Sequence, residues 1–285
     1  MCQASLAFSV MVLAVKMATA TLPAFEVVFF RSLLGSLMIG ALMVRKNVSF
    51  LGKPEHRKLL LFRGITGFLA VMLHFYTIAQ LPVGTAVMLN YTAIIFLAVL
   101  SILFLGEKPG VFLISMILTS FVGVYLLVDP RFFLVPHTGW AVFWGILSAI
   151  FAAAAVLTIR WVGFRESPLT VIFSFTGISV LGSAFFLPFG FVWPNLRDWL
   201  ALLVIGVGSF YGQLWMTIAY RRAPASLVAP FSYLTPVLSF LYGLVFWKDT
   251  LGTGNLVGVL LIILGGTLIS LFEARQGKKL PAQTV

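Results

Sequence analysis

The sequence predicts an all-α membrane protein of ten transmembrane helices, arranged as two inverted five-helix repeats around a central cavity. Three observations predict this class. The chain of 285 residues is 61% hydrophobic and only 9% charged, whereas a soluble domain carries about 25% charged residues. Nearly all of it divides into apolar stretches close to the ~20 residues that a helix needs to cross a bilayer. The second half also repeats the residue pattern of the first.

The predicted helices follow one another through short loops. In chain order they cover residues 3–20, 24–44, 59–79, 83–105, 110–128, 139–159, 168–188, 197–219, 224–247 and 254–272. The first is short, but it has neither the basic start nor the cleavage-site pattern of a signal peptide, so we expect a membrane helix. Prolines end the helices on both sides of the linker at 129–138. This linker separates a first repeat at 1–129 from a second at 138–273.

The repeat is visible as pairs of residues at the same spacing in the two halves. The pairs are Pro82 and Pro224, Tyr91 and Tyr233, Glu107 and Asp249, Gly110 and Gly252, and Gly123 and Gly265. Because each half holds an odd number of predicted spans, the second copy enters the membrane in the opposite direction. Two inverted copies around a central pathway are the sequence pattern of a transporter.

Lysine and arginine are distributed unequally between the two sides of the predicted membrane. With the N-terminus inside, the inner loops and tail hold thirteen of them and the outer side holds four, while Arg31 and Arg63 lie within spans. This bias follows the positive-inside rule and predicts that both termini are cytoplasmic. The net charge of +11 therefore reflects membrane topology, and we expect no nucleic-acid partner.

Several functional classes lack the residues they need. Cys2 is the only cysteine and the three histidines are far apart, so we expect no disulfide and no metal centre. The chain has no phosphate-binding loop of the Gly-x-x-x-x-Gly-Lys-[Ser/Thr] type. The spans supply no nucleophile with a neighbouring base. We therefore expect neither an enzyme nor a bound cofactor.

The segment LPVGTAVMLNYTAIIFLAVLSILFLGEKPG at 81–110 resembles the signature of the drug/metabolite transporter superfamily, in its EamA-type branch. The segments at 16–35 and 223–252 match the same pattern, so the resemblance covers essentially the whole chain. It implies a ten-helix inverted-repeat carrier of small organic solutes in a plasma or inner membrane. The family often has a proline in the middle of the fourth span. The second copy keeps it at Pro236, but the first has Ile94, which argues against a matching helix break there.

Polar and ionisable side chains within the predicted spans are the candidate solute contacts, because such groups are costly in lipid. The candidates are Arg31, His74, Asn90, Tyr91, Ser209, Tyr211, Gln213, Trp215, Ser232 and Tyr233. Arg31 could contact a carboxylate or phosphate on the solute, or it could form a structural pair with Glu26. His74 follows a helix face of small residues, which lines a cavity or packs tightly.

The remaining candidates form two groups. Ser209 and Gln213 share a helix face at a spacing of four residues, and with Tyr211 and Trp215 they suit a solute site, although polar side chains can also hold helices together. Asn90 and Tyr91 match Ser232 and Tyr233 in the other repeat. Prolines at 230 and 236 would free backbone carbonyls there, either for a midplane site or within a packed kink. We expect Lys16 and Arg63 to extend toward the membrane surface.

These observations predict a secondary carrier of a small organic metabolite, such as an amino acid or a related compound, with export as one direction. One alternative is an uptake carrier for a nucleotide derivative or a compound like S-adenosylmethionine. An alternative from another class is a membrane protein with a structural or receptor role and no transport. The expected partners are the solute and the lipid bilayer, with the chain a monomer or a weak homodimer in the bacterial inner membrane.

Overall fold

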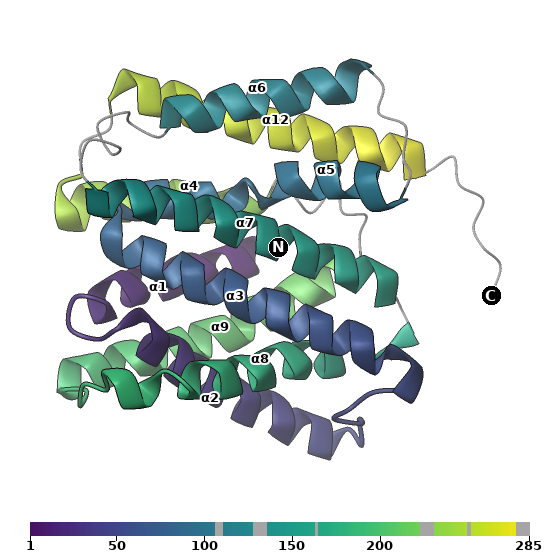
Figure 1. Ribbon diagram of the computed structural model, residues 1–285, viewed down its shortest axis with the longest axis vertical. Helices are drawn as coiled ribbons and strands as arrows, with labels where there is room; N and C mark the ends of the chain where they lie inside the picture. Colours follow the sequence, from purple (N-terminus) through teal and green to yellow (C-terminus); the bar gives the residue numbers. More distant parts are fainter. Residues whose placement is uncertain (106–110, 128–135, 163–164, 223–230, 250–251, 278–285) are drawn as a thin grey trace.

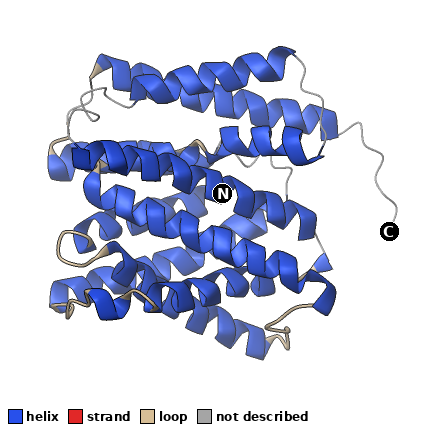
Figure 2. Ribbon diagram, in the orientation of Figure 1, coloured by secondary structure: helices blue, strands red, loops and turns tan. Residues whose placement is uncertain are grey.

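The computed structural model describes residues 1–105, 111–127, 136–162, 165–222, 231–249 and 252–277. Within these ranges the regular structure is helical, with loops and turns between helices (Figure 2). The predictions made for Glu107, Gly110, Pro224, Pro230 and most of the linker at 129–138 fall on residues outside the described ranges.

The helices match the predicted spans closely. They are α1 (Cys2–Ala18), α2 (Ala24–Arg45), α3 (Arg57–Gln80), α4 (Val83–Tyr91), α5 (Ala93–Leu105), α6 (Val111–Leu127), α7 (Pro136–Val162), α8 (Pro168–Ala184), α9 (Leu196–Arg222), α11 (Leu234–Tyr242), the π-helix η5 (Gly243–Trp247) and α12 (Thr253–Gly277), with short 3-10 turns η1 (Pro54–His56) and η4 (Leu187–Phe189). Among the described residues, five helical stretches are long and apolar enough to cross a membrane, and five further apolar stretches are shorter. The chain is therefore an all-helical membrane protein.

The fourth predicted span is interrupted, and the interruption corrects the expectation drawn from Ile94. The chain turns at Thr92, between α4 and α5, and the Thr92 N–H is shared between the carbonyls of Met88 and Leu89 at 3.2 Å each. The Thr92 hydroxyl donates to the Leu89 carbonyl at 2.6 Å. A hydroxyl that bonds back to its own helix often bends the helix, and the break occurs here without a proline at position 94. The second half turns at the matching region, at Tyr233.

Each helix of the first half packs chiefly against a helix of the second half. The main pairs are α1 with α9, α2 with α8, α3 with α7, and α6 with α12, and α4 also packs against α11. Figure 1 shows α6 and α12 side by side at one end of the bundle and α2, α8 and α9 at the other. The largest group of buried apolar side chains lies between these ends, with contributions from both halves.

Two matched glycines form a reciprocal contact between α6 and α12. A Cβ at Gly123 would lie 2.9 Å from the Gly258 carbonyl oxygen and 2.9 Å from Leu261 Cβ. In the other direction, a Cβ at Gly265 would lie 3.1 Å from the Met116 carbonyl oxygen and would overlap the Ser120 hydroxyl. The two helices therefore approach each other closely because both positions lack a side chain, as is common between membrane helices.

The loops that precede α3 and α8 are joined by the Glu166 carboxylate. Its Oε1 atom accepts a hydrogen bond from the Lys53 backbone N–H at 2.8 Å and lies 2.8 Å from His56 Nδ1. Gly52 makes this approach possible: its φ is +62°, and a Cβ there would lie 2.9 Å from Glu166 Oε2. Thr170 adds a second link, because its hydroxyl donates to the Ser49 carbonyl at 2.8 Å.

We expect Glu166→Gln to lower the melting temperature of the detergent-solubilised protein at pH 7, with an effect that disappears in acid. Burial raises the pKa of Glu166, but the bonds from His56 and Lys53 outweigh burial, so the pKa lies below its usual 4.5. A lowered carboxyl pKa contributes stability above the unfolded value, and this is lost as the pH falls through the folded value. The melting-temperature difference should therefore shrink below pH 4.5. Glu55→Gln, at an exposed position in the same loop, is the control. A difference that stays constant at low pH would contradict this assignment.

Candidate functional site

Two buried arginines from neighbouring helices contact one aromatic ring. Arg31 of α2 and Arg63 of α3 are 3% and 8% exposed. Their guanidinium carbons lie 5.3 Å and 4.8 Å from the centroid of the Phe175 ring on α8. Arg31 also lies 5.8 Å from the centroid of Phe75 on α3. The packing of α2, α3 and α8 thus brings two positive charges to one place in the bundle.

Neither guanidinium is fully satisfied by the described part of the chain. The Nε and one terminal nitrogen of both Arg31 and Arg63 are buried without a hydrogen-bond partner among the described residues. A cation–π contact contributes about 0.5–2 kcal/mol, whereas burying a charge costs several kcal/mol per ion. The ring contacts therefore offset only part of the cost of burying these two charges.

Arg63 was not among the candidates, and the expectation that it extends to the membrane surface is wrong. Its position near the start of α3 suggested a charge that reaches water. Instead the side chain lies against Gly67, one turn further along α3, where an added Cβ would overlap a guanidinium nitrogen. The absence of a side chain at Gly67 was the sequence signal that could have indicated an inward-facing arginine.

Glu26 does not pair with Arg31 as the structural alternative required. The Glu26 side chain is fully buried, and its Oε2 atom accepts a hydrogen bond from the Val192 backbone N–H at 3.1 Å. Its other oxygen has no partner among the described residues. His74 lies near enough to Arg31 for the two side chains to interact electrostatically, and its Nδ1 atom is buried without a described partner.

The matched tyrosines meet between the two halves. The rings of Tyr91 and Tyr233 are 5.9 Å apart, centroid to centroid. The Tyr233 hydroxyl donates to the Ile262 carbonyl at 3.5 Å and packs on Gly266 of α12. Beside Tyr91, the Asn90 amide donates to the Ser148 hydroxyl of α7 at 3.2 Å. Ser232 is buried directly before the turn at Tyr233.

The candidates on α9 lie on two different faces. Ser209 is 2% exposed and lies four residues after the buried Ile205, so it shares the inward face with the half-buried Gln213. Tyr211 is 40% exposed and contacts Trp215, with the rings tilted by 33° and 5.1 Å between their centroids. It belongs to a stripe of exposed residues on α9, which comprises Leu200, Leu203, Val204, Val207, Tyr211 and Ile218. An apolar stripe of this kind suits contact with lipid, so Tyr211 faces away from the inward side of α9 that Ser209 and Gln213 share.

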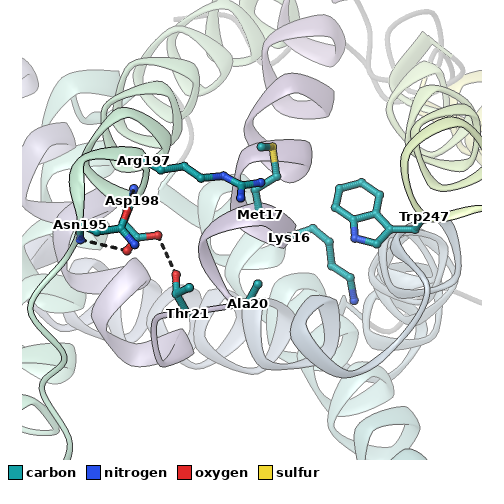
Figure 3. A pocket seen from close by; sticks show the side chains of 8 residues that line it. All are labelled: Lys16, Met17, Ala20, Thr21, Asn195, Arg197, Asp198 and Trp247. Atoms are coloured by element: carbon teal, nitrogen blue, oxygen red, sulfur yellow. Dashed lines mark hydrogen bonds between the residues drawn. The ribbon is translucent and has the colours of Figure 1, made fainter.

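A cavity of about 150 Å³ lies where the end of α1, the start of α9 and the end of η5 meet (Figure 3). It is lined by Lys16, Met17, Ala20, Thr21, Asn195, Arg197, Asp198 and Trp247. The Asp198 carboxylate is already engaged, because it accepts hydrogen bonds from the Thr21 hydroxyl at 2.6 Å and the Asn195 N–H at 3.0 Å. Solute pockets are typically about 300–1,000 Å³, so this cavity suits a few water molecules.

Lys16 borders this cavity and does not extend toward the membrane surface as expected. Its Nζ donates to the carbonyls of Ile78 and Leu81, each at 2.8 Å, and of Ala79 at 3.3 Å. These carbonyls end α3, where no further N–H is available to them. Lys16 therefore ties α1 to the end of α3.

Comparison with known proteins agrees with this fold. The model of the EamA-like transporter family matches residues 1–129 and 139–271. The chain is 36% identical to the pseudopaline exporter CntI of Pseudomonas aeruginosa over 275 residues, which are 96% of this chain and 95% of that protein. It is 33% identical to an uncharacterized transporter of Helicobacter pylori over 277 residues, 94% and 92% of the two chains.

A solved crystal structure extends the agreement to the fold as a whole. It covers 97% of this chain and 99% of its own, with a TM-score of 0.64 at 21% identity. At that identity the likeness concerns the fold alone. The family match, by contrast, covers nearly the whole chain, and the relatives are named as transporters. The chain therefore belongs to the EamA-like transporter family and is a membrane transporter of small metabolites.

Proposed function

We propose that the chain is a secondary transporter that moves a small organic metabolite across the inner membrane by alternating access. The solute is an amino acid or a related compound, and the direction is export. The similarity to a protein named as a pseudopaline exporter supports export over uptake of a nucleotide derivative. The charge bias of the loops supports an orientation with both termini in the cytoplasm.

The observation that carries this proposal is the reciprocity of contacts between the two halves. Gly123 approaches the α12 segment at 258–262, and Gly265 approaches the α6 segment at 116–120. The pair α1–α9 is likewise matched by α7–α3. When each half makes the same contact with the other half, the two halves are related by a two-fold axis. Two inverted repeats related in this way can rock against each other around a fixed site.

The broken helices support a solute site near the tyrosine pair. Tyr91 and Tyr233 contact each other beside the turns that interrupt the fourth span of each half. Interrupted helices between repeats are the usual construction of a transporter's solute site. Asn90, Ser209, Gln213 and Ser232 supply further polar groups on α4, α9 and the turn before α11.

Transport by the purified protein in proteoliposomes tests this function. We expect wild-type protein to exchange a labelled amino acid or related metabolite across the bilayer. Tyr233→Phe and Gln213→Ala should each reduce exchange about 3- to 10-fold. The first removes the hydroxyl bond to the Ile262 carbonyl that holds Tyr233 against α12, and the second removes a polar side chain of the proposed site, each worth about 1 kcal/mol. Tyr233→Phe is preferred to alanine, since truncating a buried ring would leave a cavity. Tyr211→Phe, at an exposed position of α9, should exchange as the wild type does. Full activity in both site variants would remove these positions from the pathway.

A further inference from the structure

We infer that Arg31 and Arg63 together form the recognition site for the end of a solute that carries two oxyanion charges. The charges would be two carboxylates or one phosphate monoester. This inference names the substrate class of the proposed transporter, and so it rests on the proposed function. It extends the expectation for Arg31, which concerned a single acidic group and did not include Arg63.

The first argument is that the two cations lack a counter-ion in the described part of the chain. The ion pair found there is the one between His56 and Glu166, which lies in the loops before α3 and α8. Glu26, the carboxylate nearest to Arg31 in sequence, has one oxygen bonded to the Val192 N–H. Two buried guanidinium groups therefore share the Phe175 ring, and none of the described carboxylates forms an ion pair with either.

The second argument is the number and geometry of the donors. A guanidinium presents a planar fork that matches a carboxylate or phosphate, and it stays charged throughout the physiological pH range. Nε and a terminal nitrogen are without a described partner on Arg31 and again on Arg63. One carboxylate would neutralise one of these forks and leave the other as an isolated buried cation. A group with two negative charges leaves no net charge at the site.

The surroundings add selectivity to this charge. Phe75 and Phe175 hold the Arg31 guanidinium between α3 and α8, which limits the conformations that it must lose on binding. The ring of His74 lies 6.3 Å from that of Phe75, the next residue in the chain. Its Nδ1 atom, which has no partner among the described residues, provides a third polar contact. Arg31 and Arg63 are 3% and 8% exposed, so the ligand in this inference is a free solute rather than a lipid headgroup at the surface.

The test uses the full-length protein in detergent and measures the rise in melting temperature caused by matched probes at equal ionic strength. Glutamate is compared with glutamine, and glycerol 3-phosphate with glycerol. We expect the wild type to be stabilised by the member of at least one pair that carries two oxyanion charges, and not by its partner with fewer. The responding pair tells carboxylates from a phosphate ester. Equal responses within both pairs would overturn the inference.

Variants of Arg31 and Arg63 decide whether these arginines cause the rise in melting temperature with the anionic probe. Arg31→Gln and Arg63→Gln should each weaken the apparent affinity for the responding anion at least tenfold, and Arg31→Lys should retain part of it. Arg45→Gln, at an exposed position of α2, should respond as the wild type does. If either glutamine variant keeps the full anion response, the inference is wrong.

A second measurement separates recognition from a structural role. Without ligand, Arg63→Met should melt at or above the wild-type temperature, because it replaces an uncompensated buried charge with an apolar chain of similar length. A structural arginine would give a lower melting temperature with the anion response intact, which would contradict the inference.

Transport assays distinguish the proposed transport function from the proposed anion site. Exchange of acidic and neutral solutes at equal rates would leave the transporter standing and remove its anion site, whereas anion binding without any exchange would remove the transport function.

Discussion

Gly84→Val is expected to destabilise the protein by about 1–3 kcal/mol, the usual cost of overpacking, and to abolish transport. Gly84 lies on α4, directly under the Phe240 ring of α11, and an added Cβ would overlap three ring atoms. α4 and α11 join the two halves beside the Tyr91–Tyr233 contact. Pushing them apart therefore disturbs both the packing and the proposed solute site. A melting curve of the solubilised protein and an exchange assay measure the two effects.

The same substitution at Gly177 provides the control for Gly84. On α8, a Cβ at Gly177 would meet only Phe173 Cε1, at 4.0 Å, so Gly177→Val should change the melting temperature little. Adding Phe240→Ala to Gly84→Val should restore part of the lost stability, because it removes the ring that the new side chain displaces. A double variant no more stable than Gly84→Val would show that the close contact is not the cause.

Lys16→Met is expected to destabilise the protein by about 2–3 kcal/mol, the range for charged hydrogen bonds together with the acceptors they leave unpaired. The Lys16 ammonium bonds to three carbonyls at the end of α3. It also attracts Asp249, whose carboxylate accepts a hydrogen bond from the Val83 N–H at the start of α4. Burial raises the pKa of Asp249, and the charge of Lys16 opposes that rise. Removing Lys16 therefore affects both the end of α3 and the start of α4.

Lys46→Met is the matched control for Lys16, since Lys46 is exposed in the loop after α2. Thermal melting of both variants on the same detergent preparation makes the comparison. Lys16→Arg should recover part of the stability, because its donors reach the same carbonyls with a different shape. Equal melting temperatures for Lys16→Met and the wild type would mean that water replaces the ammonium without cost.

The sequence predicts the helices well because each span is a long apolar run between polar or proline-containing loops. Its predictions fail where the decisive neighbour is distant in the chain. Whether Arg63 extends outward or stays buried depends on Phe175 of α8, and whether Tyr211 faces inward depends on how α9 packs on α1 and α2. Periodicity separates the two faces of a helix, but it does not say which face the other helices cover.

The break at Thr92 shows a different reason why a structural feature was not predicted from the sequence. The expectation relied on proline as the cause of helix breaks, and the first repeat has Ile94 where the second has Pro236. The first half nonetheless turns at Thr92, whose hydroxyl bonds to the Leu89 carbonyl, although Thr66 and Thr77 make the same kind of bond within the unbroken α3. The residue type alone therefore does not predict the break. Apart from Tyr211, which lies on the exposed stripe of α9, the candidate solute contacts remain predictions, supported by the contact of Tyr91 with Tyr233.

The pairing of helices across the halves has a consequence for synthesis. A ribosome completes the helices of the first half before those of the second half exist, and yet α1, α2, α3 and α6 find their chief neighbours in α9, α8, α7 and α12. The nascent first half must therefore wait in the bilayer with its glycine-lined and arginine-bearing faces uncovered. A chain that divides so regularly into two repeats thus behaves during biogenesis as one cooperative unit, and premature termination after the linker should yield a fragment suited to degradation rather than a stable half.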